Sequence, residues 1–258
     1  MNKLVEDAVS ASTSYLKCLV DELDCLIRQL ADKFNLFYNG RPRKAFILDV
    51  LLRYGCLGCI VKALTKQNTS RIDDIYTENH RLAVNLLCEQ LKAKLKAENF
   101  KVVVEEKVPG NYGKMDIVVK STLYGLQLQL ATFQIVVEVK CGKSLRYSQL
   151  FRYFLQDPSV SVIVVWRVTM HQIIVLERAK ISNLLPFVVD TAIRKAQAIL
   201  NDAVPPCEHS FSDKVYTVAN PQVLVDDLIE GLSRLPEVVN KIVNLLKSVL
   251  QTYEIPLK

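Results

Sequence analysis

The sequence predicts an α/β protein, in which a mixed central sheet with flanking helices is preceded and followed by helical arms. Two observations favour this class. Between about residues 100 and 176, short runs of continuous or alternating apolar residues follow one another, as strands do. Before and after them, apolar residues recur every three or four positions, which is the period of a helix face. Half of the 258 residues are hydrophobic, which excludes a disordered or low-complexity chain.

Residues 1–70 form the first predicted region, a helical N-terminal arm. Apolar residues from Leu4 to Phe34 keep helical spacing, the segment Asn39-Gly40-Arg41-Pro42 interrupts it, and residues 45–64 resume it. A polar connector over residues 67–70 then leads into the next region.

Residues 71–178 form the second region, an α/β core with the order αβββαββ. Helices are expected over residues 77–98, with Leu82 and Leu86 on the inward face, and over residues 144–156. Strand-like runs cover residues 100–108, 115–120, 133–140, 160–168 and 172–176. Strict alternation from Leu126 to Leu130 extends the third strand or forms a separate one.

Residues 179–258 form the third region, which is helical again. One helix is expected over residues 179–202, and two more over 221–232 and 236–253, each with a proline in its first turn. The last helix carries a broad apolar face from Val238 to Leu250, which predicts a homo-oligomer formed through the helical arms.

Acidic residues interrupt two of the predicted core strands. Asp116 begins an apolar strand, and Glu138 and Lys140 lie two apart in another, so their side chains share a face. Charges on a core face must be paired or used, because their burial is costly. If the two strands form a hairpin, Asp116 and Glu138 converge, and their carboxylates make a hard oxygen site for Mg²⁺ or Mn²⁺. The alternative is a structural Glu–Lys pair on an edge strand.

Positive charge gathers next to this candidate metal site. The chain carries 33 Lys and Arg against 27 Asp and Glu, a net charge of +6. The stretch from residue 140 to 152 contains no acidic residue and carries four of these cations: Lys140, Lys143, Arg146 and Arg152. In the helix that follows, Gln149 and Tyr153 are one turn apart and therefore on one face. Such a cluster favours contacts with a phosphate backbone.

The series Gly113-Lys114-Met115-Asp116, Glu138-Val139-Lys140 and Gln149-x-x-x-Tyr153 resembles the PD-(D/E)XK nuclease superfamily, in particular its RecB-like branch. The resemblance spans about residues 77–178, and the order of elements is also that of the restriction-endonuclease-like core. Met115 stands where the family's naming proline would be, and the spacing from Asp116 to Glu138 is long for a simple hairpin.

The resemblance implies a role for each matching residue. Asp116 and Glu138 would bind the metal together with the backbone carbonyl of Val139, and Lys140 would orient or help deprotonate the attacking water. Gln149 and Tyr153 would help place the nucleic acid, with Lys143, Arg146 and Arg152 nearby. The family usually adds an acid from the first core helix, for which Glu78 is preferred, because Leu82 and Leu86 continue its face, and Glu89 is the alternative.

The cysteines and histidines form no pattern of their own. Four cysteines, Cys18, Cys25, Cys56 and Cys59, lie in the N-terminal arm. We expect buried packing thiols there, with a metal site or a disulfide as alternatives. Some RecB-like exonucleases hold an iron–sulfur cluster through one upstream and three downstream cysteines. Only Cys207 lies downstream here, so that cluster is not expected. His80, His171 and His209 are scattered, and the chain has no phosphate-binding loop for ATP.

These patterns together predict a metal-dependent deoxyribonuclease that hydrolyses DNA phosphodiester bonds through a metal-activated water. The alternative is a catalytically inactive nuclease-fold protein that binds DNA or takes part in assembly. The longest apolar run, Val162–Trp166, is too short to span a membrane, and the first 15 residues lack the apolar segment of a signal peptide. A soluble, cytoplasmic protein is therefore expected.

Overall fold

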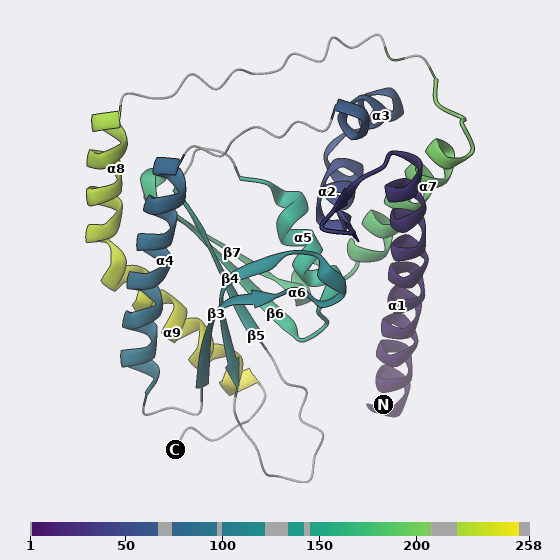
Figure 1. The fold of residues 1–258 in the computed structure, drawn as a ribbon. Helices are drawn as coiled ribbons and strands as arrows, with labels where there is room; N and C mark the ends of the chain where they lie inside the picture. Colours follow the sequence, from purple (N-terminus) through teal and green to yellow (C-terminus); the bar gives the residue numbers. More distant parts are fainter. Residues whose placement is uncertain are drawn as a thin grey trace.

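The computed structural model describes residues 2–66, 74–96, 100–121, 134–141, 145–205, 207 and 221–252. Within these ranges the chain is a mixed α/β protein, as predicted, with helices on both sides of one five-stranded sheet (Figure 1). The alternating segment Leu126 to Leu130 and the basic residue Lys143 lie outside the described residues.

The strands of the central sheet lie side by side in chain order. They are β3 (Phe100–Lys107), β4 (Lys114–Ser121), β5 (Gln134–Lys140), β6 (Val160–Arg167) and β7 (Gln172–Glu177). Neighbours are antiparallel except β5 and β6, which are parallel. A parallel pair needs a crossover, and the helix α5 (Tyr147–Gln156) provides it. The middle strands are apolar on both faces, because helices cover both.

One face of the sheet is covered by α5, and the N-terminal helices pack beyond it. This layer holds α1 (Asn2–Lys33), α2 (Lys44–Arg53), α3 (Leu57–Lys66), α6 (Arg178–Ile181) and α7 (Leu185–Leu200). A single hydrophobic core runs from Val118 and Val136 of the sheet through Leu150 to Ile27 and Val189. A small hairpin, β1 (Phe37–Tyr38) with β2 (Arg41–Pro42), follows α1.

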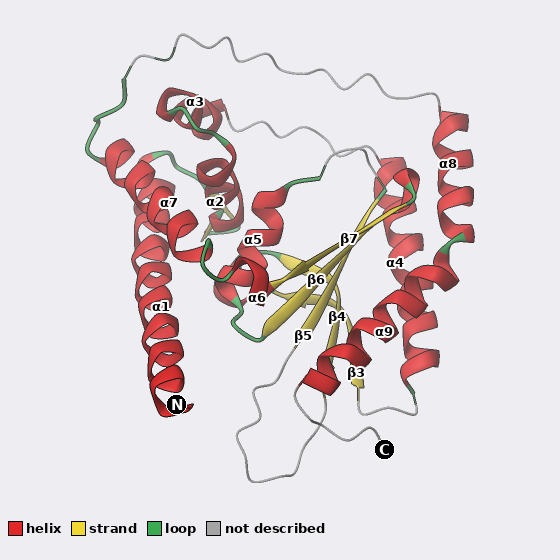
Figure 2. Ribbon diagram, turned by 180° about the vertical axis from the view of Figure 1, so that it is seen from behind, coloured by secondary structure: helices red, strands yellow, loops and turns green. Residues whose placement is uncertain are grey.

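The opposite face is covered by three helices, α4 (Asp74–Leu95), α8 (Pro221–Ser233) and α9 (Leu235–Thr252) (Figure 2). The apolar side of α9 is buried in this core through Val238, Val239, Ile242 and Leu246. The protein itself covers these residues, so they give no support to the predicted oligomer interface. None of the helices in the described ranges is both long and apolar enough to cross a membrane.

Three local predictions fail: two predicted helices are each divided in two, and a third buries a different face from the one expected. The segment 45–64 is two helices, because the chain turns at Tyr54-Gly55-Cys56. The segment 179–202 is also two, α6 and α7, because Pro186 has no N–H for a hydrogen bond to the preceding turn and so stands in the first turn of a new helix. In α4, Leu82 is 46% exposed, because the helix buries the stripe Ala83, Val84, Leu87, Cys88 and Leu91 instead.

The two predicted helical arms pack against each other. Lys33, at the end of α1, donates to the carbonyl oxygen of Ile199 at 2.8 Å, which caps the end of α7. Lys195 of α7 in turn donates to the carbonyl oxygens of Leu51 and Tyr54, both at 2.9 Å, at the end of α2. Residues from both arms therefore build one helical layer.

Candidate active site at the parting of two strands

The site begins where strands β4 and β5 part. Their ladder runs from Lys120 paired with Gln134 to Ile117 paired with Val137, and it ends there. Asp116 and Glu138 are the next residues of the two strands beyond this last pair, and Glu138 lies on the face that carries α5. The backbone N–H of Val139 donates instead to Oδ2 of Asp116, at 2.8 Å. The Asp116 side chain thus replaces a strand partner and fills the opening.

The neighbouring strand is also irregular at this level. Glu105 of β3 lies between the pairs Val104–Ile117 and Glu106–Met115, and has a φ of 51°. A positive φ at a residue other than glycine is strained and is kept only where surrounding contacts enforce it. Asp116 therefore lies in a break of the sheet. The backbone of β3 is distorted on one side of it, and β5 has parted from β4 on the other.

Glu138 is the centre of a buried polar network. Only 1% of it is exposed. Its Oε1 accepts hydrogen bonds from the ammonium of Lys140 and from Nε2 of Gln149, the latter at 2.6 Å. Its Oε2 accepts from the hydroxyl of Tyr153 at 2.9 Å. Burial, with a smaller effect from the nearby charge of Asp116, raises the pKa of Glu138, and these donors oppose that shift.

The residues predicted on α5 complete the network. The amide of Gln149 donates to the Tyr153 hydroxyl at 2.7 Å and accepts from Lys140 at 3.1 Å. The Tyr153 hydroxyl also lies 3.1 Å from the carbonyl oxygen of Lys114. Burial raises the pKa of Tyr153, so the phenol stays protonated and acts as a donor. Three motifs that are far apart in the sequence therefore meet through hydrogen bonds.

His80 of α4 joins the site from the other face of the sheet, and the sequence reasoning missed it. Its Nε2 lies 3.3 Å from Oδ1 of Asp116, and this hydrogen bond raises the pKa of His80. The sequence did contain a signal: His80 precedes Ala83, Leu87 and Leu91 at helical spacing, and these residues form the buried stripe of the helix.

The two acids considered on α4, Glu78 and Glu89, are both exposed. Glu78 was preferred because Leu82 and Leu86 were expected to continue an inward face. That expectation of the inward face is wrong, since Leu82 is exposed and Leu86 is only half-buried. His80 is the side chain of α4 that contacts Asp116.

The predicted basic residues have different surroundings. Arg146 is exposed just before α5 begins. Arg152, in contrast, is 6% exposed, and its guanidinium lies 3.3 Å from both carboxylate oxygens of Asp49 on α2. Burial raises the pKa of Asp49, and the nearby Arg152 opposes that shift. Arg152 thus ties α5 to α2, away from solvent, and Arg146 is the described cation of this stretch that faces solvent beside the site.

Comparison with known proteins gave a simple result. No family model, curated protein or solved structure matches the chain. The chemistry of the site must therefore be argued from its own residues.

The side chains at this site are of the types that hard divalent cations bind, but the ligand atoms of His80, Asp116 and Glu138 do not all lie within 4.8 Å of one another. Asp116 and Glu138 supply carboxylate oxygens, and His80 adds an imidazole nitrogen. The N–H of Val139 points toward β4, and in an extended strand the carbonyl of the same residue points to the same side, beyond the end of the ladder. Oxygen donors with one imidazole suit Mg²⁺ or Mn²⁺ rather than a soft metal.

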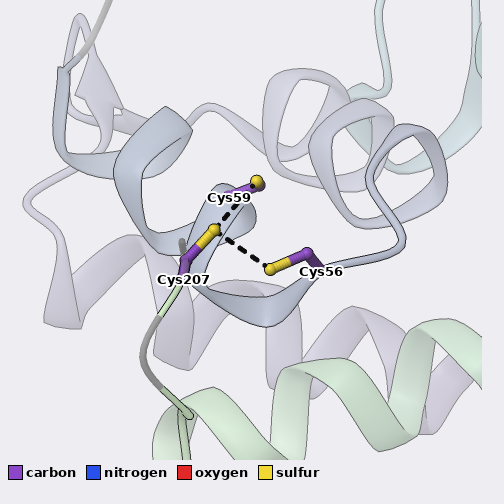
Figure 3. Close-up of side chains that lie close together, drawn as sticks. All are labelled: Cys56, Cys59 and Cys207. Atoms are coloured by element: carbon purple, nitrogen blue, oxygen red, sulfur yellow. Dashed lines mark hydrogen bonds between the residues drawn. The ribbon is translucent and has the colours of Figure 1, made fainter. Parts of the chain in front are cut away.

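A second group of metal-ligating side chains lies elsewhere, in the helical layer. Cys56, Cys59 and Cys207 have their sulfur atoms within 4.8 Å of one another, and in the described ranges they are the one His, Cys, Asp or Glu trio this compact (Figure 3). The neighbouring thiols raise the pKa of Cys59 to about 11, chiefly through the hydrogen bond with Cys207. Cys18 and Cys25 are exposed, so the prediction that they pack in the core is wrong.

Proposed function

We propose that the protein is a metal-dependent deoxyribonuclease that hydrolyses phosphodiester bonds. One observation carries this proposal: the side chains of Asp116, Glu138, Lys140, Gln149 and Tyr153 meet at a break in the sheet, although they come from three separate elements. A solely structural Glu–Lys pair would not need an aspartate inserted between parted strands or two further donors on its carboxylate.

The cation would be held by the carboxylates of Asp116 and Glu138 and the carbonyl oxygen of Val139, with His80 orienting the Asp116 carboxylate. When bound there, Mg²⁺ or Mn²⁺ supplies polarisation of the phosphoryl group and a lowered pKa for a coordinated water. Donors that are mostly oxygen favour Mg²⁺ or Mn²⁺ over zinc, whose sites are richer in nitrogen and sulfur.

Lys140 is the movable group of the site. Its ammonium now contacts Oε1 of Glu138 and the amide oxygen of Gln149, and about a fifth of the side chain is exposed. The lysine would balance the charge on a phosphate oxygen or a water from this position at the rim of the site. Gln149 and Tyr153 keep the Glu138 carboxylate oriented throughout, because both donate to it from one side of α5.

The nucleic acid would approach along the start of α5. Arg146 is exposed there, and Lys143 precedes it by three residues in the sequence. The first turn of a helix carries positive partial charge, which favours phosphate near the start of α5. These groups favour a phosphate backbone, and the proposal takes DNA as the nucleic acid that supplies it.

One observation favours a second candidate, the inactive nuclease-fold DNA-binding protein. Glu138 is almost fully buried, and both of its oxygens already accept hydrogen bonds from Lys140, Gln149 and Tyr153. In such a protein the network would serve only to hold β5 against α5, and DNA binding would rely on exposed cations.

Cleavage of DNA with and without Mn²⁺ separates the two. Glu138→Gln and Lys140→Met should each lower Mn²⁺-dependent cleavage by about 100-fold or more, because charge stabilisation at the reacting phosphate is lost. Glu106→Gln and Lys120→Met are matched controls, since this pair joins β3 to β4 in the same sheet with a separation of 3.0 Å and both side chains are about 30% exposed.

Calorimetry on the same proteins measures Mn²⁺ binding. The nuclease is supported if the wild type binds Mn²⁺ and cleaves DNA, and the two site variants lose both while the controls keep both. Salt-sensitive DNA binding without Mn²⁺ binding or cleavage supports the inactive protein and refutes the nuclease. Cleavage that persists in both site variants refutes the assignment of the site.

A further inference from the structure

Three cysteines meet in the helical layer, far from the parted strands. Cys56 immediately precedes α3, Cys59 lies in its first turn, and Cys207 belongs to the segment that follows α7. The sulfur of Cys207 lies 3.2 Å from that of Cys56 and 3.3 Å from that of Cys59 (Figure 3). Three thiols from two distant parts of the chain therefore point at one common volume.

The backbone around this trio is shaped to bring Cys207 close. A Cβ atom added at Gly58 would lie 2.2 Å from the Cβ of Cys207 and 3.2 Å from its Cα. Only glycine therefore fits at position 58 of the Cys56-Leu-Gly-Cys59 turn. The ammonium of Lys62, one turn further along α3, donates to the carbonyl oxygen of Cys207 at 3.3 Å. Contacts other than those of the thiols thus also hold Cys207 in place.

We infer that Cys56, Cys59 and Cys207 form a three-thiolate binding site for a single zinc ion. Each thiol gives its proton to solvent as its sulfur–zinc bond forms. In tetrahedral coordination with zinc–sulfur bonds of about 2.3 Å, sulfur atoms lie about 3.8 Å apart. The observed separations of 3.2 and 3.3 Å are shorter than that value by about half an ångström, and the third pair lies within 4.8 Å, so a small outward shift of the sulfur atoms makes room for the ion. Water takes the fourth position.

Two other fates of these thiols fit the geometry less well. In a [4Fe–4S] cluster each cysteine binds a different iron, so their sulfur atoms lie farther apart than those that share one ion. A disulfide would join two of the sulfurs and leave the third beside it. Cys207 lies at nearly equal distances from the other two sulfurs, which is the arrangement that a shared ion requires.

The zinc would join two parts of the helical layer. It links the start of α3 to the segment after α7, and these are 148 residues apart between Cys59 and Cys207. The hydrogen bonds from Lys195 to the end of α2 already join α7 to the helix that precedes α3. Loss of zinc should therefore loosen the packing of α3 on α7 and leave the hydrogen bonds of Glu138 in place.

Metal analysis of the full-length protein tests the inference. Protein purified without chelators should hold about one zinc per chain by mass spectrometry of the metals. Cys59→Ser and Cys207→Ser should bind zinc about 100-fold or more weakly, because a direct ligand is worth at least as much as the groups that orient one. Cys18→Ser and Cys25→Ser are matched controls, since both lie exposed in α1 and should retain the zinc.

Cobalt in place of zinc gives a readout on the wild type, so the test does not depend on how the variants fold. Tetrahedral Co²⁺ with thiolate ligands shows visible d–d bands and a strong sulfur-to-metal charge-transfer band, and both should appear. Full zinc content in Cys207→Ser would overturn the inference. So would iron with broad visible absorption, or two thiols that resist alkylation unless a reductant is added. None of these measurements involves DNA, so the result is independent of the proposed nuclease activity.

Discussion

The hydroxyl of Tyr153 offers a sharp test of the buried network. Replacement by phenylalanine keeps the ring, which is fully buried, and removes one oxygen atom. That oxygen donates to Glu138 Oε2 at 2.9 Å, accepts from Gln149 at 2.7 Å and lies 3.1 Å from the carbonyl oxygen of Lys114. Tyr153→Phe therefore leaves a buried carboxylate with one donor fewer and removes one of the two acceptors of the half-buried Gln149 amide.

The cost follows from these contacts. A hydrogen bond to a charged group contributes about 1.5–3 kcal/mol, and one between neutral groups contributes about 1 kcal/mol. The shape of the core is unchanged, so no large cavity term is added. Tyr153→Phe should lower the free energy of unfolding by about 3 kcal/mol, or the melting temperature by roughly 6–12 °C for a chain of this size.

The penalty should also depend on pH. The Tyr153 hydroxyl favours the charged form of Glu138 and so opposes the rise that burial causes in the pKa of Glu138. The lost bond therefore costs most above that raised pKa, where Glu138 is ionised, and costs less as pH falls through it. Both effects are measured by urea unfolding in EDTA at several pH values.

Tyr147→Phe is the matched control, because Tyr147 lies on the same helix and is 56% exposed. Its free energy of unfolding should stay within about 0.5 kcal/mol of the wild type. Equal stabilities for Tyr153→Phe and Tyr147→Phe would show that the hydroxyl does not hold Glu138. A penalty that does not change with pH would show that Glu138 is not the partner that matters.

Three further changes test other parts of the fold. Arg178→Met should lower the free energy of unfolding by about 3 kcal/mol or more, because the guanidinium donates to three backbone carbonyls at 2.6–2.7 Å around the end of α5. Gly231→Ala should cost about 1–3 kcal/mol, since a Cβ there would lie 2.3 Å from the carbonyl oxygen of Val168. His80→Gln in EDTA should destabilise more at acidic than at alkaline pH. The hydrogen bond to Asp116 raises the pKa of His80, so its contribution is complete below about pH 6.5 and is lost as pH rises through the folded-state pKa.

Each of these changes has a control of the same chemical type, and urea unfolding is the common measurement. Arg194→Met removes an exposed cation that pairs with Asp190 within α7 and should change stability by less than about 0.5 kcal/mol. A Cβ at Gly55 meets no atom within 4 Å, so Gly55→Ala should be nearly neutral. His171→Gln tests a histidine that pairs with Glu230 instead. Where a variant and its control behave alike, the contact named for it does not stabilise the protein.

Most of the sheet could be predicted, because its strands are recognisable from local sequence alone. The run Val160–Arg167 is apolar throughout, since helices cover both faces of the sheet, and its predicted and observed bounds differ by one residue. The helix breaks were harder, because a single turn such as Tyr54-Gly55-Cys56 leaves the apolar period on both sides intact. Whether a helix bends there depends on what it packs against, which local sequence does not contain.

Some residues of the candidate site could likewise be predicted from local sequence, and others could not. Asp116 and Glu138 stand out locally, because each is a charge within an apolar strand. His80 does not, because its role depends on how α4 is rotated against the sheet, and a shift of one or two residues in the inward stripe exchanges it for Glu78. Cys207 was missed for a related reason: its partners lie about 150 residues earlier, and no local pattern connects them.

Arg152 shows how the helical layer and the site depend on each other. Arg152 pairs with Asp49 of α2 in a nearly dry environment, and a pair of this kind adds little net stability. It does fix register, because any slip between α2 and α5 would leave a buried charge without a partner. Tyr153, the next residue, holds the Glu138 carboxylate from the same helix. The contact that positions the N-terminal helices therefore also positions the helix on which the proposed active site relies.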